Sequence, residues 1–184
     1  MDHKRLVTFS KFLSKHLRHQ PEALELTLAD GGWVEVEALL AACEKHGFPI
    51  TRAQLDEVVR TSDKKRFAFD ETNTRIRANQ GHSAPVDLQL EPLQPPAILY
   101  HGTAKKNVTV ILAFGLLKMK RHHVHLSLEI ATALQVGQRH GEPVIFAVDT
   151  AAMDARGHLF YRSENGVWLT DHVPAEFLKV IDEM

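Results

Sequence analysis

The sequence contains a single cysteine, Cys43. One cysteine excludes an internal disulfide and any zinc site built from several thiolates. Cys43 lies in the run Ala-Leu-Leu-Ala-Ala-Cys, which favours a buried thiol on a helix over a reactive nucleophile. A lone thiol in an apolar setting is typical of a protein of the reducing cytoplasm, and we expect that location.

Long apolar runs and a net charge of one sign are also lacking. No run approaches the roughly 20 residues of a membrane-spanning helix, and the polar N-terminus has no signal-peptide core. The net charge is -1, and acidic and basic residues nearly balance in each half of the chain. Any anion-binding site must therefore be local. We expect a monomer with no membrane partner.

Apolar residues near the N-terminus recur at helical spacing, from Leu6 to Leu17. The helix should end at Arg18, His19 and Gln20, because Pro21 disfavours helix in the residue before it. Cations are stabilised at a helix C-terminus by the helix dipole. Considered locally, that position explains Arg18 and His19 without any function.

Two further helices and a hairpin are predicted next. One helix carries Val36 to Cys43, and Thr51 caps another that carries Leu55 to Val59. The segments 66–69 and 75–77 flank a polar turn and form a β-hairpin. Three helices followed by a two-stranded wing is the order of a winged helix. We assign residues 1–79 to this lobe and the proline-containing segment 80–96 to a surface linker.

Residues 97–184 are predicted to form an α+β domain. A strand over 98–103 runs into a glycine turn, and helices follow from residue 108 and over about 128–138. Residues 143–148 form an apolar strand. Short β segments are expected at 159–161, 167–169 and 177–181.

The segment Lys118–Ser127 stands out because it concentrates cations and imidazoles. As a strand it would place Val124, Leu126 and His122 on one face, and Arg121, His123, His125 and Ser127 on the other. The polar face suits an anionic, hydroxylated ligand, but it suits a solvated edge strand equally well. A zinc site on His123 and His125 is a third interpretation, although no third ligand is marked.

Several motifs together resemble the NAD-dependent RNA 2′-phosphotransferase family, of KptA type. They are Ser10-Lys-Phe-Leu with Leu17-Arg-His19, Thr61-Ser-Asp-Lys-Lys-Arg-Phe67, Gln80-Gly-His82, Leu99-Tyr-His-Gly-Thr103, Arg121-His-His-Val-His-Leu-Ser127, Arg139-His-Gly141 and Glu164-Asn-Gly-Val-Trp-Leu169. No single motif is specific to the family, but their order and spacing over nearly the whole chain are highly specific.

The resemblance implies an α+β protein in which a winged-helix-like lobe joins an ADP-ribosyltransferase-like lobe over 97–184. It implies removal of an internal 2′-phosphate from RNA, a reaction that belongs to RNA processing such as tRNA splicing. The phosphate attacks the nicotinamide ribose of NAD and nicotinamide departs. A phospho-ADP-ribosylated RNA is formed. The adjacent ribose hydroxyl then attacks phosphorus and releases RNA and ADP-ribose 1″,2″-cyclic phosphate. NAD is consumed as co-substrate, and no metal is expected.

The family's essential basic residues correspond here to Arg18, His19, Arg66 and Arg121. By analogy these catalytic residues converge from both lobes on one phosphate, which arginine grips with its fixed fork. His19 is expected to act as general acid. The resemblance places five further residues around NAD: His101, Gly102, Thr103, His125 and Ser127. Val167 stands where ordinary ADP-ribosyltransferases keep a glutamate, and we do not assign that role to Glu164.

Two alternative functions stay open from the sequence. One is an ADP-ribosyltransferase that modifies terminal phosphates of nucleic acids or a protein, which shares the NAD site without needing the basic quartet. The other is a winged-helix binding module without catalysis. The near-neutral charge of residues 1–79 argues against the second, because nonspecific duplex binding depends on phosphate contacts.

Overall fold

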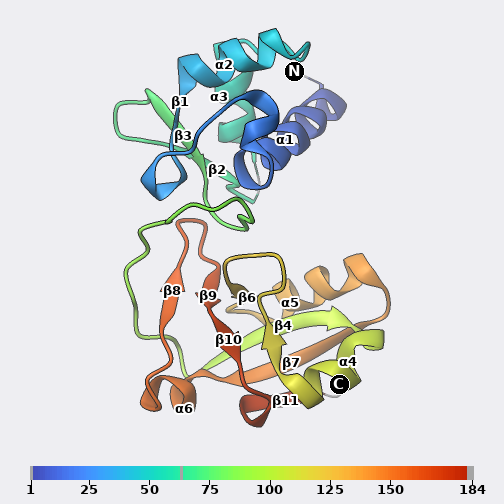
Figure 1. Cartoon of the computed structure of the whole chain (residues 1–184). Helices are drawn as coiled ribbons and strands as arrows, with labels where there is room; N and C mark the ends of the chain where they lie inside the picture. Colours follow the sequence, from blue (N-terminus) through green and yellow to red (C-terminus); the bar gives the residue numbers. More distant parts are fainter. Residues whose placement is uncertain (1, 63, 182–184) are drawn as a thin grey trace. The chain divides into compact units, whose positions relative to one another are not determined.

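A computed structural model describes residues 2–62 and 64–181 of the chain (Figure 1). These residues form six α-helices and several small antiparallel sheets, so the structure is of mixed α and β type. The chain divides into two compact units, Met1–Gln89 and Leu90–Met184. Among the described helices, none combines the length and the apolar character needed to traverse a bilayer.

The first unit contains the three helices and the hairpin that the sequence predicts. Its elements are α1 (His3–Arg18), β1 (Val34–Glu35), α2 (Val36–Lys45), α3 (Arg52–Thr61), β2 (Phe67–Phe69) and β3 (Arg75–Ala78), with 3-10 turns at Pro21–Leu24 and Asp30–Gly32. Thr51 begins α3 with a capping box shared with Gln54. The expected two-stranded wing is wrong in one respect, because β1 pairs with β3 and makes a third strand. A strand of two residues is too short to show alternation.

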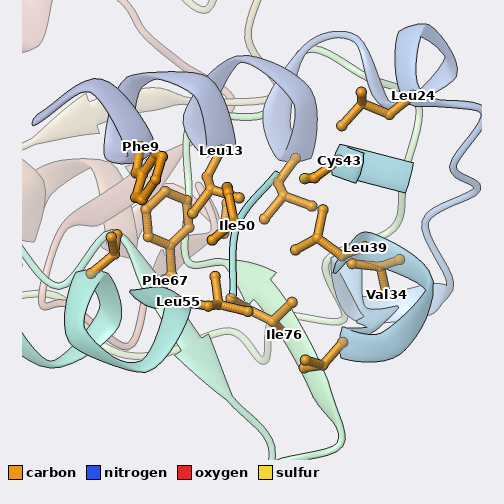
Figure 2. Close-up of a cluster of buried hydrophobic side chains, with 14 residues drawn as sticks. Phe9, Leu13, Leu24, Val34, Leu39, Cys43, Ile50, Leu55, Phe67 and Ile76 are labelled. Atoms are coloured by element: carbon orange, nitrogen blue, oxygen red, sulfur yellow. The ribbon is translucent and has the colours of Figure 1, made fainter. Parts of the chain in front are cut away.

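The core of the first unit lies between the helices and this sheet. Figure 2 shows Phe9 and Leu13 of α1 pointing toward Leu55 of α3 and toward Phe67 and Ile76 of the sheet. Leu13, Leu55 and Ile76 are completely buried. The buried face of α1 therefore holds the helix in place, and its other face remains available to line a surface.

Residues 80–89 are packed into the first unit. His82, Ala84 and Leu88 are buried, and the amides of Ser83 and Ala84 both donate to the carbonyl of Arg18, at 2.8 and 2.9 Å. A surface linker over the whole of 80–96 is therefore wrong for this part. Prolines and polar residues suggested a linker, whereas these contacts close the carbonyl end of α1.

The second unit contains an antiparallel sheet covered by a helix. Its strands are β4 (Ile98–Ala104), β7 (Pro143–Asp149) and β11 (Leu178–Ile181), in the order β11-β7-β4. Helix α5 (Ile130–Gly137) packs against β4 and β7. The register places His101 opposite Phe146 and Gly102 opposite Ile145. The predicted strands at 98–103 and 143–148 are confirmed.

A second sheet in this unit has the order β6-β9-β8. The remaining elements are α4 (Val108–Phe114), β5 (Leu116–Leu117), β6 (Val124–Leu126), α6 (Thr150–Ala155), β8 (Phe160–Arg162), β9 (Trp168–Thr170) and β10 (His172–Val173), with 3-10 turns at Lys105–Asn107, Gln138–His140 and Ala175–Phe177. Tyr100 and Ser127 exchange backbone hydrogen bonds of 2.8 and 2.7 Å. This bridge ties β4 to the end of β6.

The predicted strand over 118–127 is shorter than expected. Only Val124–Leu126 is a strand, and Val124 and Leu126 are buried as predicted. Arg121 instead lies in a turn, where its amide donates to the carbonyl of Lys118 at 3.0 Å. Met119 has a φ of 53°, outside the extended region, so the alternation of faces does not hold before the strand begins.

Candidate functional site

A basic cavity of about 590 Å³ lies along α1 in the first unit. Its lining residues are His3, Leu6, Val7, Ser10, Lys11, Ser14, Lys15, Arg18, His19, Val58, Thr61, Ser62, Lys64 and Arg66. Arg18, His19 and Arg66 are therefore gathered on one cavity, although 47 positions separate the last two in the sequence. Three of the four residues predicted to be catalytic therefore line this cavity, and the fourth, Arg121, belongs to the other unit.

The end of α1 positions two of these side chains. Arg18 is the last residue of the helix and His19 is its C-cap. The Arg18 Nη2 donates to the Arg66 carbonyl at 3.4 Å, which connects the helix end to the residue just before β2. His19 Nδ1 lies 2.9 Å from Ser83 Oγ, so residue 83 helps to orient the imidazole. Sequence reasoning missed Ser83, which no local pattern marks.

The charged residues that line the cavity are basic, as far as the structure describes the chain. Lys11, Lys15, Arg18, Lys64 and Arg66 contribute cations, and no carboxylate is among its lining residues within 2–62 and 64–181. Guanidinium groups bind phosphate oxygens through charge-assisted hydrogen bonds and keep their charge at every relevant pH. This cavity is suited to a phosphate group that carries two negative charges.

A second group of polar side chains surrounds His101 in the other unit. His101 Nδ1 lies 3.0 Å from the backbone carbonyl of His125. Because a carbonyl only accepts, His101 carries its proton on Nδ1 and leaves Nε2 as an acceptor. Burial lowers the pKa of His101, and the nearby Arg121 lowers it further. The hydrogen bond to the His125 carbonyl acts in the opposite direction, but the net shift of the pKa is downward and favours the neutral imidazole.

Arg121 lies beside His125 although it precedes the strand. Its Nη1 lies 3.1 Å from His125 Nδ1. A guanidinium only donates, so Nδ1 of His125 accepts and the ring of a neutral His125 has its proton on Nε2. The Tyr100–Ser127 bridge brings Ser127 against β4 next to His101. Four predicted residues, namely Arg121, His125, His101 and Ser127, thus belong to one local arrangement.

Gly102 and Thr103 have roles in packing. A Cβ added at Gly102 would lie 1.7 Å from the Ala133 carbonyl oxygen, so the absence of a side chain lets α5 approach β4. Thr103 is buried and its Oγ1 accepts a hydrogen bond from Asn107 Nδ2 at 3.1 Å. The sequence motif suggested that a ligand approaches the backbone at this glycine. In the structure, it is the backbone of helix α5 that approaches it.

The histidines considered for zinc have other neighbours. The His123 ring lies 5.4 Å from the Tyr161 ring, and burial lowers the pKa of His123. In the part of the chain that the structure describes, no three His, Cys, Asp or Glu side chains are grouped so that they could hold a metal ion.

Comparison with known proteins identifies the family. Residues 4–172 match the model of the RNA 2′-phosphotransferase, Tpt1 / KptA family. The chain is 62% identical over 182 residues to a probable RNA 2′-phosphotransferase of Trichormus variabilis, covering 99% of this chain and 100% of that protein. It is 60% identical to one of Nostoc punctiforme, over 98% and 100% of the two chains, and 55% identical to one of Streptomyces coelicolor, over 97% of each. The chain belongs to the RNA 2′-phosphotransferase family, a family of transferases that act on the 2′-phosphate of RNA.

Proposed function

We propose that this chain removes an internal 2′-phosphate from RNA by transferring it to NAD. The observation that carries the proposal is the gathering of Arg18, His19 and Arg66 on one basic cavity. Family membership supports the RNA 2′-phosphate as the group transferred. The arrangement around His101 supports a site for the NAD ribose, because a neutral imidazole with a fixed tautomer can accept from a hydroxyl.

The fold supports the same assignment. The order α1, β1, α2, α3, β2, β3, with the sheet order β1-β3-β2, is that of a winged helix, and we infer that the first unit is of this type. We infer that the second unit is the ADP-ribosyltransferase-like lobe. Its two three-stranded antiparallel sheets, β11-β7-β4 and β6-β9-β8, meet at the Tyr100–Ser127 bridge, next to His101. That region is where the proposed NAD site lies.

In the first step an oxygen of the 2′-phosphate forms a bond to C1″ of the nicotinamide ribose. The bond from C1″ to the nicotinamide nitrogen breaks, and nicotinamide departs with its electron pair. A phosphate monoester has a second pKa of about 6, so it is an anionic nucleophile at neutral pH without a base. This explains why Val167 can stand where other ADP-ribosyltransferases use a glutamate. His101 and Ser127 orient the ribose.

In the second step the 2″-hydroxyl of the same ribose attacks phosphorus and releases its proton to solvent, and the bond from phosphorus to the RNA 2′-oxygen breaks. Arg18 and Arg66 stabilise the negative charge on the phosphoryl oxygens as this happens. His19 donates a proton to the departing 2′-oxygen, and its contact with Ser83 orients the ring. Arg121 keeps the role that the family resemblance predicts, as a further guanidinium for the phosphate.

A single-turnover experiment with 2′-phosphorylated RNA and labelled NAD tests the proposal. Wild-type protein should yield RNA with a free 2′-hydroxyl only when NAD is added. His19→Ala should release nicotinamide and accumulate ADP-ribosylated RNA, with the second step slowed roughly 10²- to 10⁴-fold. His46→Ala is the matched control, since His46 lies in the same unit, outside the lining of the cavity, near Glu25 at 3.4 Å.

Two results would contradict this assignment. If His19→Ala fails to release nicotinamide and no intermediate accumulates, His19 acts in the first step. If wild-type protein attaches ADP-ribose to RNA that has no 2′-phosphate, an ADP-ribosyltransferase with another acceptor replaces the proposed function.

A further inference from the structure

The cavity extends far beyond the three residues assigned to the 2′-phosphate. Residues of α1 line it from the first position of the helix to the last: His3, Leu6, Val7, Ser10, Lys11, Ser14, Lys15 and Arg18. These positions recur every three or four residues and form one face of the helix. At about 1.5 Å per residue, this face is roughly 22 Å long. A single phosphate occupies only the end near Arg18.

Two lysines continue the basic character of the cavity away from Arg18. Lys15 lies three residues before Arg18, and Lys11 lies four residues before Lys15. The two steps are about 4.5 and 6 Å along the helix axis, of the same order as the spacing of successive phosphates in a nucleic acid strand. Both lysines are exposed, and among residues 2–62 and 64–181 neither forms an ion pair. The half-buried Ser10 and Ser14 place hydroxyl groups beside them.

The rest of the lining indicates which kind of polyanion fits. The lining residues outside α1 are Val58, Thr61, Ser62, Lys64 and Arg66. A cavity of about 590 Å³ bounded by α1 and by these residues accepts a single strand more readily than a duplex, which is broader. Toward the N-terminal end of α1, Leu6 and Val7 add apolar surface to the lining.

We propose that Lys11 and Lys15 bind the phosphodiesters that neighbour the 2′-phosphate, so that single-stranded RNA lies along α1. This inference rests on the proposed function, since it places the reacting phosphate at Arg18, His19 and Arg66. It adds a substrate preference: the protein should favour RNA with several nucleotides beside the 2′-phosphate over a minimal dinucleotide.

Binding without NAD provides the test, because it does not depend on turnover. Fluorescence anisotropy would measure the affinity of a 2′-phosphorylated RNA of roughly ten nucleotides and of a 2′-phosphorylated dinucleotide, at a series of salt concentrations. The variants are Lys11→Gln, Lys15→Gln and the double variant. Lys4→Gln is the matched control, because Lys4 is an exposed lysine of the same helix that does not line the cavity.

For the long RNA, the slope of log affinity against log salt should become shallower by about 0.7 for each lysine removed. The slope for the dinucleotide should change less, and Lys4→Gln should change the slope for neither RNA. The inference is overturned if the long RNA keeps its slope in the double variant, or if both lengths lose affinity equally. It is also overturned if an acidic peptide of equal charge competes as well as the RNA.

Catalysis is measured separately with the same RNAs. If the lysine variants change the salt slopes as expected but wild-type protein leaves the 2′-phosphate in place with NAD, the proposed function is refuted and RNA binding along Lys11 and Lys15 is retained. Protein that turns over both RNAs with equal kcat/KM would refute RNA binding along these lysines and retain the proposed function.

Discussion

Gly102→Ala should destabilise the second unit severely. The new Cβ would lie 1.7 Å from the Ala133 carbonyl oxygen, 2.5 Å from the Ala133 carbonyl carbon and 3.1 Å from the Gly137 amide nitrogen. Ordinary contact begins at 3.4 Å, so the first distance must double. All three atoms belong to the backbone of α5, and no rotation of a side chain can relieve the overlap.

The helix must therefore move away from β4, and the packing of Ala133, which is completely buried, is lost. Overpacking of a core costs about 1–3 kcal/mol when side chains can adjust, so we expect about 3 kcal/mol or more here. Gly157→Ala is the control in the same unit. Its φ is 85° with nothing within 4 Å of an added Cβ, so only the backbone conformation is penalised, by about 1 kcal/mol.

Urea unfolding monitored by Trp168 fluorescence would measure both changes. Trp33→Phe removes the signal of the first unit, since the chain has 2 tryptophans and Trp33 lies in that unit. If Gly102→Ala costs no more free energy of unfolding than Gly157→Ala, the role of Gly102 in helix packing is refuted.

Three further predictions follow from the protonation of individual groups. Arg121→Gln should raise the pKa of His101, because the nearby cation contributes to its lowering, and an unchanged NMR titration of the imidazole would contradict this. Asp70 accepts hydrogen bonds from the amides of Thr74 and Arg75, both at 3.0 Å, and its pKa is lowered to about 2. Ionised Asp70 therefore stabilises the hairpin fully above the unfolded pKa of about 3.9, and this stabilisation is lost as pH falls through about 2. A midpoint near 4 in the pH titration of the NMR shifts of these two amides would contradict the lowered pKa of Asp70. Burial raises the pKa of Cys43 to about 11, so the thiol should react with a disulfide reagent only in unfolded protein, and rapid reaction of native protein would argue against its burial.

Helices with a clear apolar period were predictable from the sequence. The spacing from Leu6 to Leu17 and the cap at Thr51 both correspond to observed elements. The two-residue strands β1, β5 and β10 were not predictable, because a strand of that length has no period. Their pairing is decided by tertiary contacts.

The candidate site could be predicted only in part from the local sequence pattern. Arg18 and His19 read locally as a helix end, and the family resemblance was needed to select them with Arg66. Ser83, which contacts His19, lies in a segment whose prolines and polar residues suggested a linker. Long-range contacts of this kind leave no signal in neighbouring residues.

Lys11 and Lys15 did leave a signal that was open to interpretation. They share a helical face with Arg18, at spacings of three and four residues. On sequence alone that stripe is indistinguishable from a solvated helix face. The structure shows that this stripe lines a cavity together with residues outside α1, namely Val58, Thr61, Ser62, Lys64 and Arg66.

The most direct test of the account is to follow a labelled 2′-phosphate on RNA with and without NAD. The label should leave the RNA only when NAD is present, and Arg18→Gln or Arg66→Gln should slow its departure by at least about 10²-fold. Departure of the label without NAD, or at an undiminished rate in both variants, would contradict the claim that these side chains of one cavity act on the phosphate.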